Sequence, residues 1–299
     1  MKFVVTGGAG FIGSHIAKHL VNHNHSVTVV DNLSRGRLGN LSKIEEQIEF
    51  KKIDILDFNA LKEIISNSDG IFHQAALTSV PESFTQKEKY HDVNVKGTEN
   101  IFKLSKEFGK KVVYASSSSI YGNTTTIPIQ ENFEKNPINP YGVTKLDDEK
   151  LAEKYHNLGV SIIGLRYFNV YGVGQTNDYA GVITKFINQI NLNQSPIIFG
   201  DGSQTRDFIS VEDVAKANLL SMESNTDFSF LNIGTGISTS VKTLAEVMIE
   251  LSGKTLEISY DDLPLGDVKE SLADTSLAKK LINWNYDTFL KNGLKKFFF

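Results

Sequence analysis

Short apolar runs alternate with amphipathic segments along the N-terminal part of the chain. The apolar runs are rich in β-branched residues, which is typical of buried strands, and they fall at 2–6, 27–30, 48–53, 70–73, 111–115 and 161–167. Apolar residues three or four positions apart predict the helices between them, at about 13–22, 57–67, 90–108 and 141–158. This alternation of strands and helices predicts a doubly wound, parallel α/β sheet.

The pattern changes after residue 170. A helix is expected at about 180–192, and a helix at about 211–222 followed by a strand at 230–233 indicates a return to the sheet. The remainder, 236–299, predicts two helices around a strand. We therefore expect a sheet domain formed by 1–169 with 209–235 returning to it, and a smaller lobe formed by 170–208 and 236–299.

A glycine cluster directly follows the first predicted strand. Gly7, Gly10 and Gly13 lie between that strand and the first helix. Glycine allows a tight turn and lets the backbone approach a ligand closely. The helix N-terminus adds free N–H groups and the positive end of a dipole, which suit a pyrophosphate. The segment therefore predicts the phosphate-binding turn of a Rossmann-type dinucleotide site.

Asp31 ends the second predicted strand, about 20 residues past the glycines, where a ribose-binding acid is expected. A carboxylate there accepts hydrogen bonds from ribose hydroxyls and repels a 2′-phosphate, so NAD is favoured over NADP. The alternative is a glycine turn in an unrelated α/β protein, with Asp31 an ordinary strand-end residue.

Later strand ends add candidates for the same site. Asp54 is placed to meet an adenine amino group, and it is an equally good cap for the next helix. Gln74, Ala75 and Ala76 follow the fourth strand, and their small or slender side chains leave room for a cofactor across the strand ends.

Tyr141 and Lys145 are four residues apart at the start of a predicted helix, so they share one of its faces. Asn139 can cap this helix, and Pro140 suits its first position. A neighbouring ammonium favours a phenolate, which makes the pair a candidate general base. The alternative is a tyrosine packed at a helix start beside a solvent-facing lysine.

Composition narrows the possible functions. The chain has 299 residues, enough for two lobes around a cleft, and its net charge of −4 gives no electrostatic basis for binding nucleic acid. It has no cysteine, which excludes disulfides and fits a reducing compartment. It opens on a strand and has no apolar run as long as a membrane span, so we expect a cytoplasmic protein without a membrane partner.

Three histidines at four-residue spacing, His15, His19 and His23, follow one face of the first helix. Such spacing can hold a metal ion. No carboxylate accompanies them in a ligand pattern, so a solvated helix face is favoured and no metal site is expected.

Five segments occur in one order: Thr6–Gly13, Ser116–Gly122, Tyr141–Lys145, Leu165–Gly172 and Gly200–Phe208. In this order they resemble the extended short-chain dehydrogenase/reductase superfamily, and within it the UDP-glucose 4-epimerases. The resemblance runs from the first strand to about Trp284.

The resemblance implies roles for particular residues. The catalytic serine of this family lies four residues before a Tyr-Gly pair, which here is Ser117; Tyr141 matches its base and Lys145 its lysine, which also holds the nicotinamide ribose. Together, the residues and the resemblance predict an NAD site formed by Gly7, Gly10, Phe11, Ile12, Gly13, Asp31, Asn32, Asp54, Ile55, Gln74, Ala75, Ala76, Asn94, Tyr141, Lys145 and Phe168.

The implied site for the UDP-sugar includes Ser117 and Tyr141 together with residues of the later motifs. Asn169 matches a nucleotide-sugar ligand, Phe199 the residue beside the uracil, and Arg206 an arginine on the diphosphate, where a guanidinium fits phosphate oxygens. Without the resemblance, a surface ion pair between Arg206 and Asp207 would be favoured.

The implied activity is NAD-dependent 4-epimerisation of UDP-hexoses through a 4-keto sugar. The related 4,6-dehydratases and UDP-glucuronate decarboxylases place an acid soon after the catalytic Ser or Thr, and none stands between Ser117 and Tyr121. A UDP-glucuronate 4-epimerase remains an alternative. A non-catalytic NAD-binding sensor, the alternative from another class, would need the glycine turn but neither Tyr141 nor Lys145.

The chain departs from the family at one point. Family members often carry an arginine two residues before a C-terminal Gly-Asp pair, and Pro264, which cannot bind phosphate, stands there; Lys269 is a possible substitute. Counting five from Gly266 places Ser271 opposite the 2-substituent of the sugar, where a small residue leaves room for an N-acetyl group. The alternative is that Ser271 is an outward-facing strand residue.

Relatives commonly form homodimers by pairing the two long helices, here about 90–108 and 141–158. The first of these carries several apolar side chains that could serve such an interface, namely Val93, Ile101, Leu104 and Phe108. We therefore expect a homodimer, with packing on the sheet as the alternative use of these residues.

Overall fold

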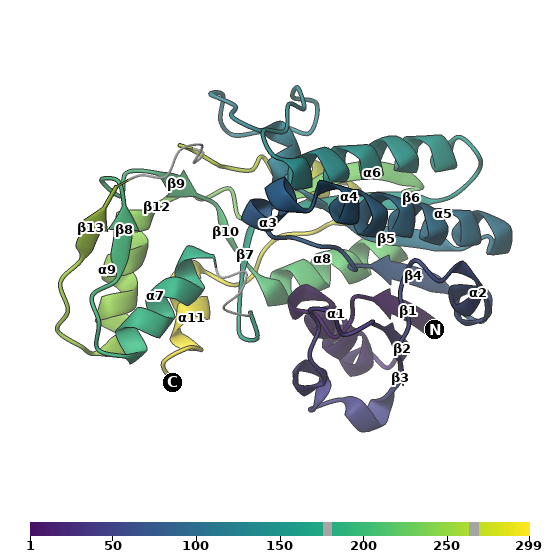
Figure 1. The fold of residues 1–299 in the computed structure, drawn as a ribbon, viewed down its shortest axis with the longest axis horizontal. Coiled ribbons are helices and arrows are strands. Elements are labelled where there is room, and N and C mark those ends of the chain that lie inside the picture. Colours follow the sequence, from purple (N-terminus) through teal and green to yellow (C-terminus); the bar gives the residue numbers. More distant parts are fainter. Residues whose placement is uncertain (176–180, 263–268) are drawn as a thin grey trace.

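The protein has a larger lobe built around a sheet and a smaller lobe beside it (Figure 1). This arrangement is seen in a computed structural model that describes residues 1–175, 181–262 and 269–299.

Seven parallel strands form the sheet of the larger lobe. In chain order they are β1 (Lys2–Thr6), β2 (Ser26–Val30), β3 (Ile48–Lys51), β4 (Gly70–His73), β5 (Lys111–Ser117), β6 (Ile162–Tyr167) and β11 (Phe228–Ile233). Their spatial order is β11-β6-β5-β4-β1-β2-β3. The chain runs outward from β1 to β3 and then returns to β4 on the other side of β1. The predicted doubly wound sheet is confirmed, and its switch point lies between β1 and β4.

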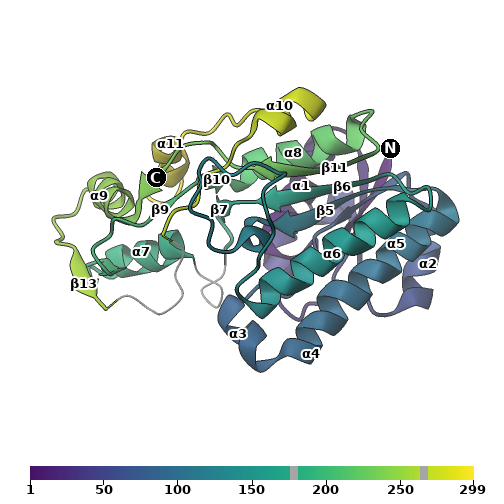
Figure 2. The ribbon, with the colours of Figure 1, turned by 90° about the horizontal axis from the view of Figure 1, so that it is seen from above.

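Helices cover both faces of this sheet (Figure 2). On one face lie α1 (Phe11–Asn22) and α8 (Val211–Glu223), and on the other lie α2 (Phe58–Ser66), α5 (Gly97–Phe108) and α6 (Pro140–His156). Because both faces are buried, the strands are almost continuously apolar, which is the pattern that identified them in the sequence.

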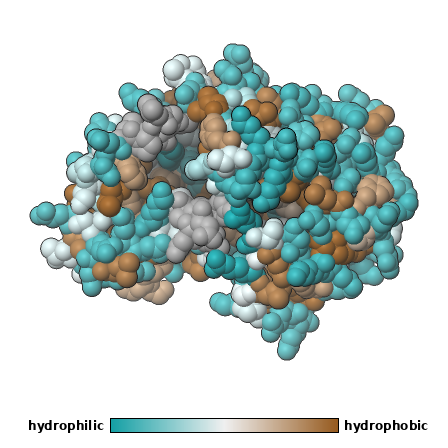
Figure 3. Space-filling model, viewed as in Figure 1, coloured by the Kyte–Doolittle hydropathy of each residue, from teal (hydrophilic) through white to brown (hydrophobic). Residues whose placement is uncertain are grey.

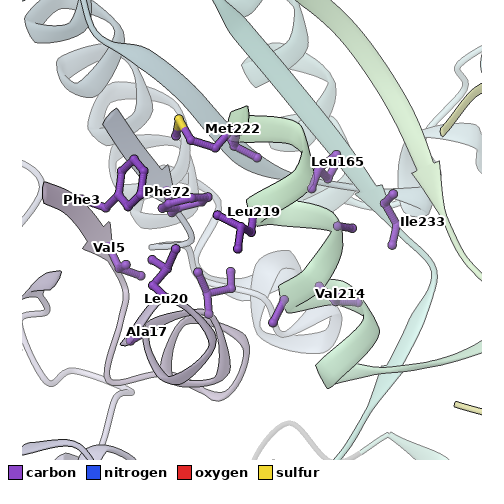
Figure 4. Packing of buried hydrophobic residues seen from close by; sticks show 14 of the residues in the cluster. Phe3, Val5, Ala17, Leu20, Phe72, Leu165, Val214, Leu219, Met222 and Ile233 are labelled. Atoms are coloured by element: carbon purple, nitrogen blue, oxygen red, sulfur yellow. The ribbon is translucent and has the colours of Figure 1, made fainter. Parts of the chain in front are cut away.

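Successive strand residues enter different hydrophobic layers, because side chains alternate across a strand. Val5 packs in the layer under α1 and α8, together with Leu20, Leu219 and Met222 (Figure 4). Val4 packs in the opposite layer, under α2 and α5. These two layers fix the register of the strands and hence the positions of the loops that follow them.

The helix expected at about 90–108 is divided. It consists of α4 (Lys87–Tyr90), a π-helical turn at His91–Lys96, and α5. The π-helical turn carries Asn94, whose side chain bonds both the N–H and the carbonyl group of Leu77. A sequence period of 3.6 residues cannot reveal such a turn, because the extra residue changes the helix face only locally.

The smaller lobe has its own core, formed mainly by α7 (Val182–Asn191) and α9 (Val241–Ser252). Its strands form three short pairs. These pairs are β7 (Asn169–Tyr171) with β10 (Phe208–Ser210), β9 (Thr205–Arg206) with β12 (Thr239–Ser240), and β8 (Ile197–Phe199) with β13 (Ser259–Asp261). The division of the chain into two domains stays a prediction.

Among its described residues, the C-terminal region contains one helix more than expected. After α9 and β13 come both α10 (Ser276–Ile282) and α11 (Leu290–Lys295). α10 packs on the larger lobe, where Ala278, Ile282 and Trp284 join the layer under α8. The Trp284 indole N–H donates to the Asp213 carbonyl oxygen at 3.0 Å. This short segment returns to the first core, which the weak periodicity of 270–284 did not indicate.

The apolar residues expected at a dimer interface are largely used within the chain. Ile101 and Leu104 on α5 are fully buried, whereas Val143 on α6 is 44% exposed. Hydrophilic residues cover most of the face seen in Figure 3, with hydrophobic residues between them. None of the described helices is both long enough and apolar enough to cross a membrane.

Candidate active site

A pocket of about 330 Å³ lies at the switch point of the sheet. Its walls come from the segments that follow β1, β2, β4 and β5, together with the start of α6. It brings together most of the predicted cofactor residues and all three predicted catalytic residues: Gly7, Gly10, Phe11, Ile12, Gly13, Asp31, Asn32, Ile55, Gln74, Ala75, Ala76, Ser117, Tyr141, Lys145 and Phe168.

Only glycine fits at Gly7, in the turn after β1, and at Gly13, in the first turn of α1. Gly7 has a φ of +66°, and a Cβ on it would lie 2.6 Å from the Ala75 nitrogen at the end of β4. A Cβ on Gly13 would lie 2.2 Å from the Gly7 carbonyl oxygen. The turn therefore packs against both α1 and β4 without side chains, which leaves the N-terminus of α1 open to the pocket, where a pyrophosphate fits.

Asp31 connects the glycine turn to the loop after β2. Its Oδ2 accepts from the Ala9 N–H at 3.0 Å, and its Oδ1 accepts from the Leu33 N–H at 2.8 Å. Burial raises the pKa of Asp31, and these two backbone hydrogen bonds oppose the rise. A carboxylate offers about four acceptor positions, so Asp31 has capacity left for hydroxyl groups of a ligand in the pocket.

The loop at 33–41 also lines the pocket, which sequence reasoning did not identify. Its Arg37 N–H and Asn40 side chain both donate to the Ala9 carbonyl oxygen at 2.9 Å, so the loop holds the glycine turn. The Arg35 guanidinium binds the Glu82 carboxylate of α3 (Val80–Thr85) at 2.6 Å and 2.7 Å. The two arginines shortly after Asp31, Arg35 and Arg37, are the signal that could have indicated this wall. The loop contributes Ser34, Arg35, Gly36 and Asn40 to the pocket.

Two predicted cofactor residues lie outside the pocket lining. Asp54 accepts from the Asn32 side-chain amide at 2.8 Å and from the Leu56 N–H at 2.9 Å. Asn94 is buried behind the wall, where its amide binds Leu77 and donates to the Thr144 hydroxyl at 3.0 Å. In this geometry both side chains hold neighbouring segments in place.

The four serines after β5 have different environments. Ser117 lines the pocket, and its Oγ accepts from the Ser119 hydroxyl at 2.9 Å and from the Ser119 N–H at 3.2 Å. Ser116 is buried and donates to the Glu149 carboxylate at 2.7 Å. Because the Ser117 oxygen is already an acceptor, its own proton remains for a group inside the pocket.

The N-terminus of α6 is fixed beside these serines. The Gly142 N–H donates to the Asn139 side chain at 2.8 Å, which confirms the expected cap, and Pro140 begins the helix. A Cβ on Gly142 would lie 2.9 Å from the Ser119 carbonyl oxygen, so helix and loop approach closely. This approach brings Tyr141 into the pocket that contains Ser117.

A buried ionic cluster contacts the serine loop after β5 on the side away from the pocket. The Arg166 guanidinium on β6 binds the Glu149 carboxylate through Nε at 2.8 Å and Nη2 at 2.9 Å. Its Nη1 donates to the Tyr121 hydroxyl at 2.7 Å. Bidentate contacts and the further hydrogen bond from Ser116 satisfy the carboxylate, which a buried ion pair requires.

Predicted substrate residues lie near the pocket on adjacent hydrogen-bonded segments around residues 169, 205–207 and 270–273, which we call the seam. The Asn169 side chain donates to the Asp207 carbonyl oxygen at 3.3 Å, and Arg206 donates to the Thr205 carbonyl oxygen at 2.9 Å. The Ser271 N–H donates to the same Thr205 oxygen at 3.2 Å. Asn169, Arg206 and Ser271 are thus brought to adjacent segments, although none of them lines the pocket described above.

Asp207 anchors this seam. It is buried, so the alternative of a surface ion pair with Arg206 does not describe it. Its carboxylate accepts from the Thr235 N–H and hydroxyl, both at 2.7 Å, from the Gly236 N–H at 2.9 Å and from the Ala273 N–H at 3.2 Å. Burial raises the pKa of Asp207, and these hydrogen bonds oppose the rise.

The remaining sequence candidates are more peripheral or not described. Phe199 is 37% exposed on β8, with the Lys185 ammonium 5.9 Å from its ring centroid. Pro264 and Gly266 lie outside the described residues. Among the described residues, the histidines of α1 form no metal-binding group; the His19 and His23 rings lie 4.2 Å apart.

The glycine turn, Asp31 and the switch-point pocket define a dinucleotide-binding α/β protein with a polar reaction centre. The chain belongs to the NAD dependent epimerase/dehydratase family, whose model matches residues 3–234.

Individual relatives match almost the whole chain. A UDP-glucuronate 4-epimerase of Thermodesulfobacterium geofontis is 37% identical over 98% of this chain and 94% of its own length. The structure of a UDP-N-acetylglucosamine 4-epimerase from Methanobrevibacter ruminantium has a TM-score of 0.95 at 37% identity and covers 99% of this chain and 96% of its own. A UDP-glucose 4-epimerase of Thermotoga maritima has a TM-score of 0.93 at 36% identity and covers 99% and 96%.

The glycine turn generates a direct test. Gly13→Ala should weaken NAD binding on the order of tenfold or more, about 1.4 kcal/mol, because the new methyl group would displace the Gly7 carbonyl. Isothermal titration calorimetry measures the affinity. Gly39→Ala is the matched control, since a Cβ there meets nothing within 4 Å. NAD binding of Gly13→Ala equal to that of wild type would contradict the prediction.

Proposed function

We propose that this protein is an NAD-dependent UDP-sugar 4-epimerase. The observation that carries the proposal is the placement of Ser117, Tyr141 and Lys145 in one pocket with the glycine turn and Asp31. Family membership and the UDP-sugar 4-epimerases among the relatives support it.

The pocket fits NAD. The glycine turn can receive the pyrophosphate, Asp31 the adenosine ribose, and Lys145 the nicotinamide ribose. When bound, NAD supplies the acceptor and then the donor of the hydride exchanged at C4 of the sugar, which becomes a 4-keto sugar in between.

The proposed reaction uses three side chains of this chain. Ser117 receives the proton of the sugar 4-hydroxyl while it passes its own proton to the Tyr141 phenolate. The Lys145 ammonium stabilises that phenolate, since it lies on the same helix face one turn away. The 4-keto sugar then rotates in the pocket so that its other face meets the cofactor. The proton transfers to O4 then run in the reverse order. No proton is gained or lost in the full cycle, as an epimerisation requires.

The seam at Arg206 and Ser271 is the proposed site for the diphosphate and the sugar 2-substituent. Ser271 is half-buried and pairs with the strand that carries Arg206. A serine here leaves more room than a tyrosine would. We therefore propose that the enzyme accepts UDP-N-acetylhexosamines as well as UDP-glucose and UDP-galactose.

A second candidate is 4-epimerisation of UDP-glucuronate. The relative from Thermodesulfobacterium geofontis carries this activity in its name. Both candidates use the same three catalytic residues, so a panel of UDP-sugars distinguishes them. A galactose-related role and a cytoplasmic location remain proposals; the absence of cysteine from the sequence fits a reducing compartment.

Tyr141→Phe should reduce kcat by about 10²–10⁴-fold, since it removes a positioned general base. NAD binding should persist. The measurement is chromatographic separation of UDP-glucose from UDP-galactose over time. Tyr260→Phe, whose residue is 53% exposed on β13, is the control. Epimerisation by Tyr141→Phe near the wild-type rate would show that the base is assigned wrongly.

Ser271→Tyr should lower kcat/KM for UDP-N-acetylglucosamine at least tenfold and leave UDP-glucose much less affected, because the ring would fill the space of the acetamide. Steady-state kinetics on both substrates gives the ratio. Ser276→Tyr, at an exposed position in α10, controls for the added bulk. An unchanged ratio in Ser271→Tyr would exclude Ser271 as the residue that sets this preference.

We also propose a homodimer in which the exposed sides of α5 and α6 pair. Val143 on α6 supports this arrangement, because it is 44% exposed on one of the two helices concerned. Static light scattering at micromolar concentration should therefore give twice the chain mass, and Val143→Lys should shift the mass toward that of one chain. A monomeric wild type would refute the proposal.

A further inference from the structure

A buried carboxylate lies directly behind the candidate catalytic lysine. The Lys145 ammonium donates to Asp148 Oδ2 at 3.1 Å, and the two side chains are 4% and 0% exposed. Lys145 reaches the pocket, whereas Asp148 does not line it. Tyr141, Lys145 and Asp148 are spaced four and three residues apart, so they form one stripe along α6. The ammonium thus stands between a carboxylate and the pocket.

We propose that Asp148 is a positioning residue that holds the Lys145 head and sets the net charge next to Tyr141, and thereby the pH range in which the Tyr141 phenolate forms. This inference rests on the proposed function for its kinetic readout. An ionised Asp148 offsets the positive charge of Lys145, and the phenolate is then less stabilised. A protonated Asp148 leaves the full positive charge, and the phenolate is more stabilised.

Among Tyr141, Lys145 and Asp148, the surroundings make Asp148 the residue whose charge changes near neutral pH. Burial raises the pKa of Asp148 to about 7 and the charge of Asp147 adds to the rise, although the charge and hydrogen bond of Lys145 and the hydroxyl of Thr98 on α5 oppose it. Its carboxylate therefore changes charge near neutral pH. The Oδ1 atom of Asp148 makes no hydrogen bond to any described residue, so little else holds the ionised form.

The other titratable groups near the pair stay in one state near neutral pH. Burial lowers the pKa of His73 on β4 to about 3, so its ring is neutral; it binds the Thr6 hydroxyl through Nδ1 at 2.6 Å and the Thr98 hydroxyl through Nε2 at 2.9 Å. Burial, with the charges of Glu149 and Asp148 adding to it, raises the pKa of Tyr114 on β5 well above its usual value.

The two neighbouring carboxylates of α6 are engaged elsewhere. Asp147 points to the surface side, where it binds the Lys150 ammonium at 2.8 Å, and Glu149 is held by Arg166. The charge beside Lys145 that can change near neutral pH is therefore that of Asp148. Asp147 also provides a matched control, because it carries the same group one position away on the same helix.

The test compares Asp148→Asn, Asp148→Ala and Asp148→Glu with Asp147→Asn. Asparagine retains an acceptor for Lys145 but removes the charge, so the part of the acid limb of kcat/KM that lies above neutral pH, where wild-type Asp148 is ionised, should move to lower pH by about one unit. Below neutral pH, where wild-type Asp148 is protonated, the two profiles should converge. Alanine removes the acceptor too, so kcat at the plateau should fall further. Glutamate keeps the charge, so its acid limb should match that of wild type. Asp147→Asn removes only the smaller contribution of Asp147 to the pKa of Asp148, so it should leave the plateau unchanged and move the limb much less than Asp148→Asn.

A second readout needs no turnover. The tyrosinate absorbance of Tyr141 is obtained for each variant by subtracting the ultraviolet absorbance of the same variant carrying Tyr141→Phe. In Asp148→Asn this signal should appear at lower pH than in wild type. If wild type epimerises no UDP-sugar, the proposed function fails, but this titration still decides the role of Asp148.

Thermal unfolding checks that each variant folds. If Asp148→Asn does not fold, Asp148→Glu decides: an acid limb and tyrosinate signal at wild-type positions support the proposal, and a displacement of either overturns it. If Asp148→Asn folds with the pH profile and tyrosinate signal of Asp147→Asn, the pair has a structural role only and the proposal is wrong.

Discussion

The close approach of the glycine-rich turn after β1 to two neighbouring elements is the constraint on which this structure depends. Gly13 brings α1 against the Gly7 carbonyl, and Gly7 brings the turn against Ala75 at the end of β4. Because β1 and β4 flank the switch point, this contact determines the width of the pocket between them. Asp31 and the loop at 33–41 then close the turn from the other side through hydrogen bonds to Ala9.

Buried charges surround this pocket in pairs. Arg166 and Glu149 join β6 to α6 beneath the serine loop, and Lys145 and Asp148 lie further along the same helix. A buried ion pair adds little net stability compared with apolar residues, because desolvation offsets the attraction between the charges. What these pairs supply is position: Arg166 fixes Glu149 on α6 relative to β6, and Asp148 fixes the Lys145 ammonium within α6, the helix whose side chains would touch the substrate.

Much of the cofactor end of the site could be predicted from the sequence, because each part is local. The glycine turn, Asp31 and the Asn139 cap of α6 each occupy a few consecutive residues whose conformation follows from their own chemistry. The burial of Asp148 beside Lys145 could not be predicted, since an acid three residues after Lys145 fits a solvent-exposed helix position equally well. Its burial depends on α5 and β5, which pack against α6 from distant parts of the chain. The position of Asn94 behind the wall was missed for a similar reason, because the π-helical turn that directs it has no local signature.

The proposed substrate end, where Arg206 and Ser271 lie, is assembled in a different way. Arg206 and Ser271 meet because a two-residue strand pairs with a segment more than sixty residues later, and Asp207 ties both to the loop after β11. These contacts are mostly backbone hydrogen bonds, which tolerate a change of side chain. If the seam holds the sugar as proposed, substitutions along it can therefore alter the space around the sugar without moving α6. On this view the chemistry and the choice of sugar are physically separable in this fold: one depends on charges buried within the larger lobe, the other on side chains carried by short paired strands.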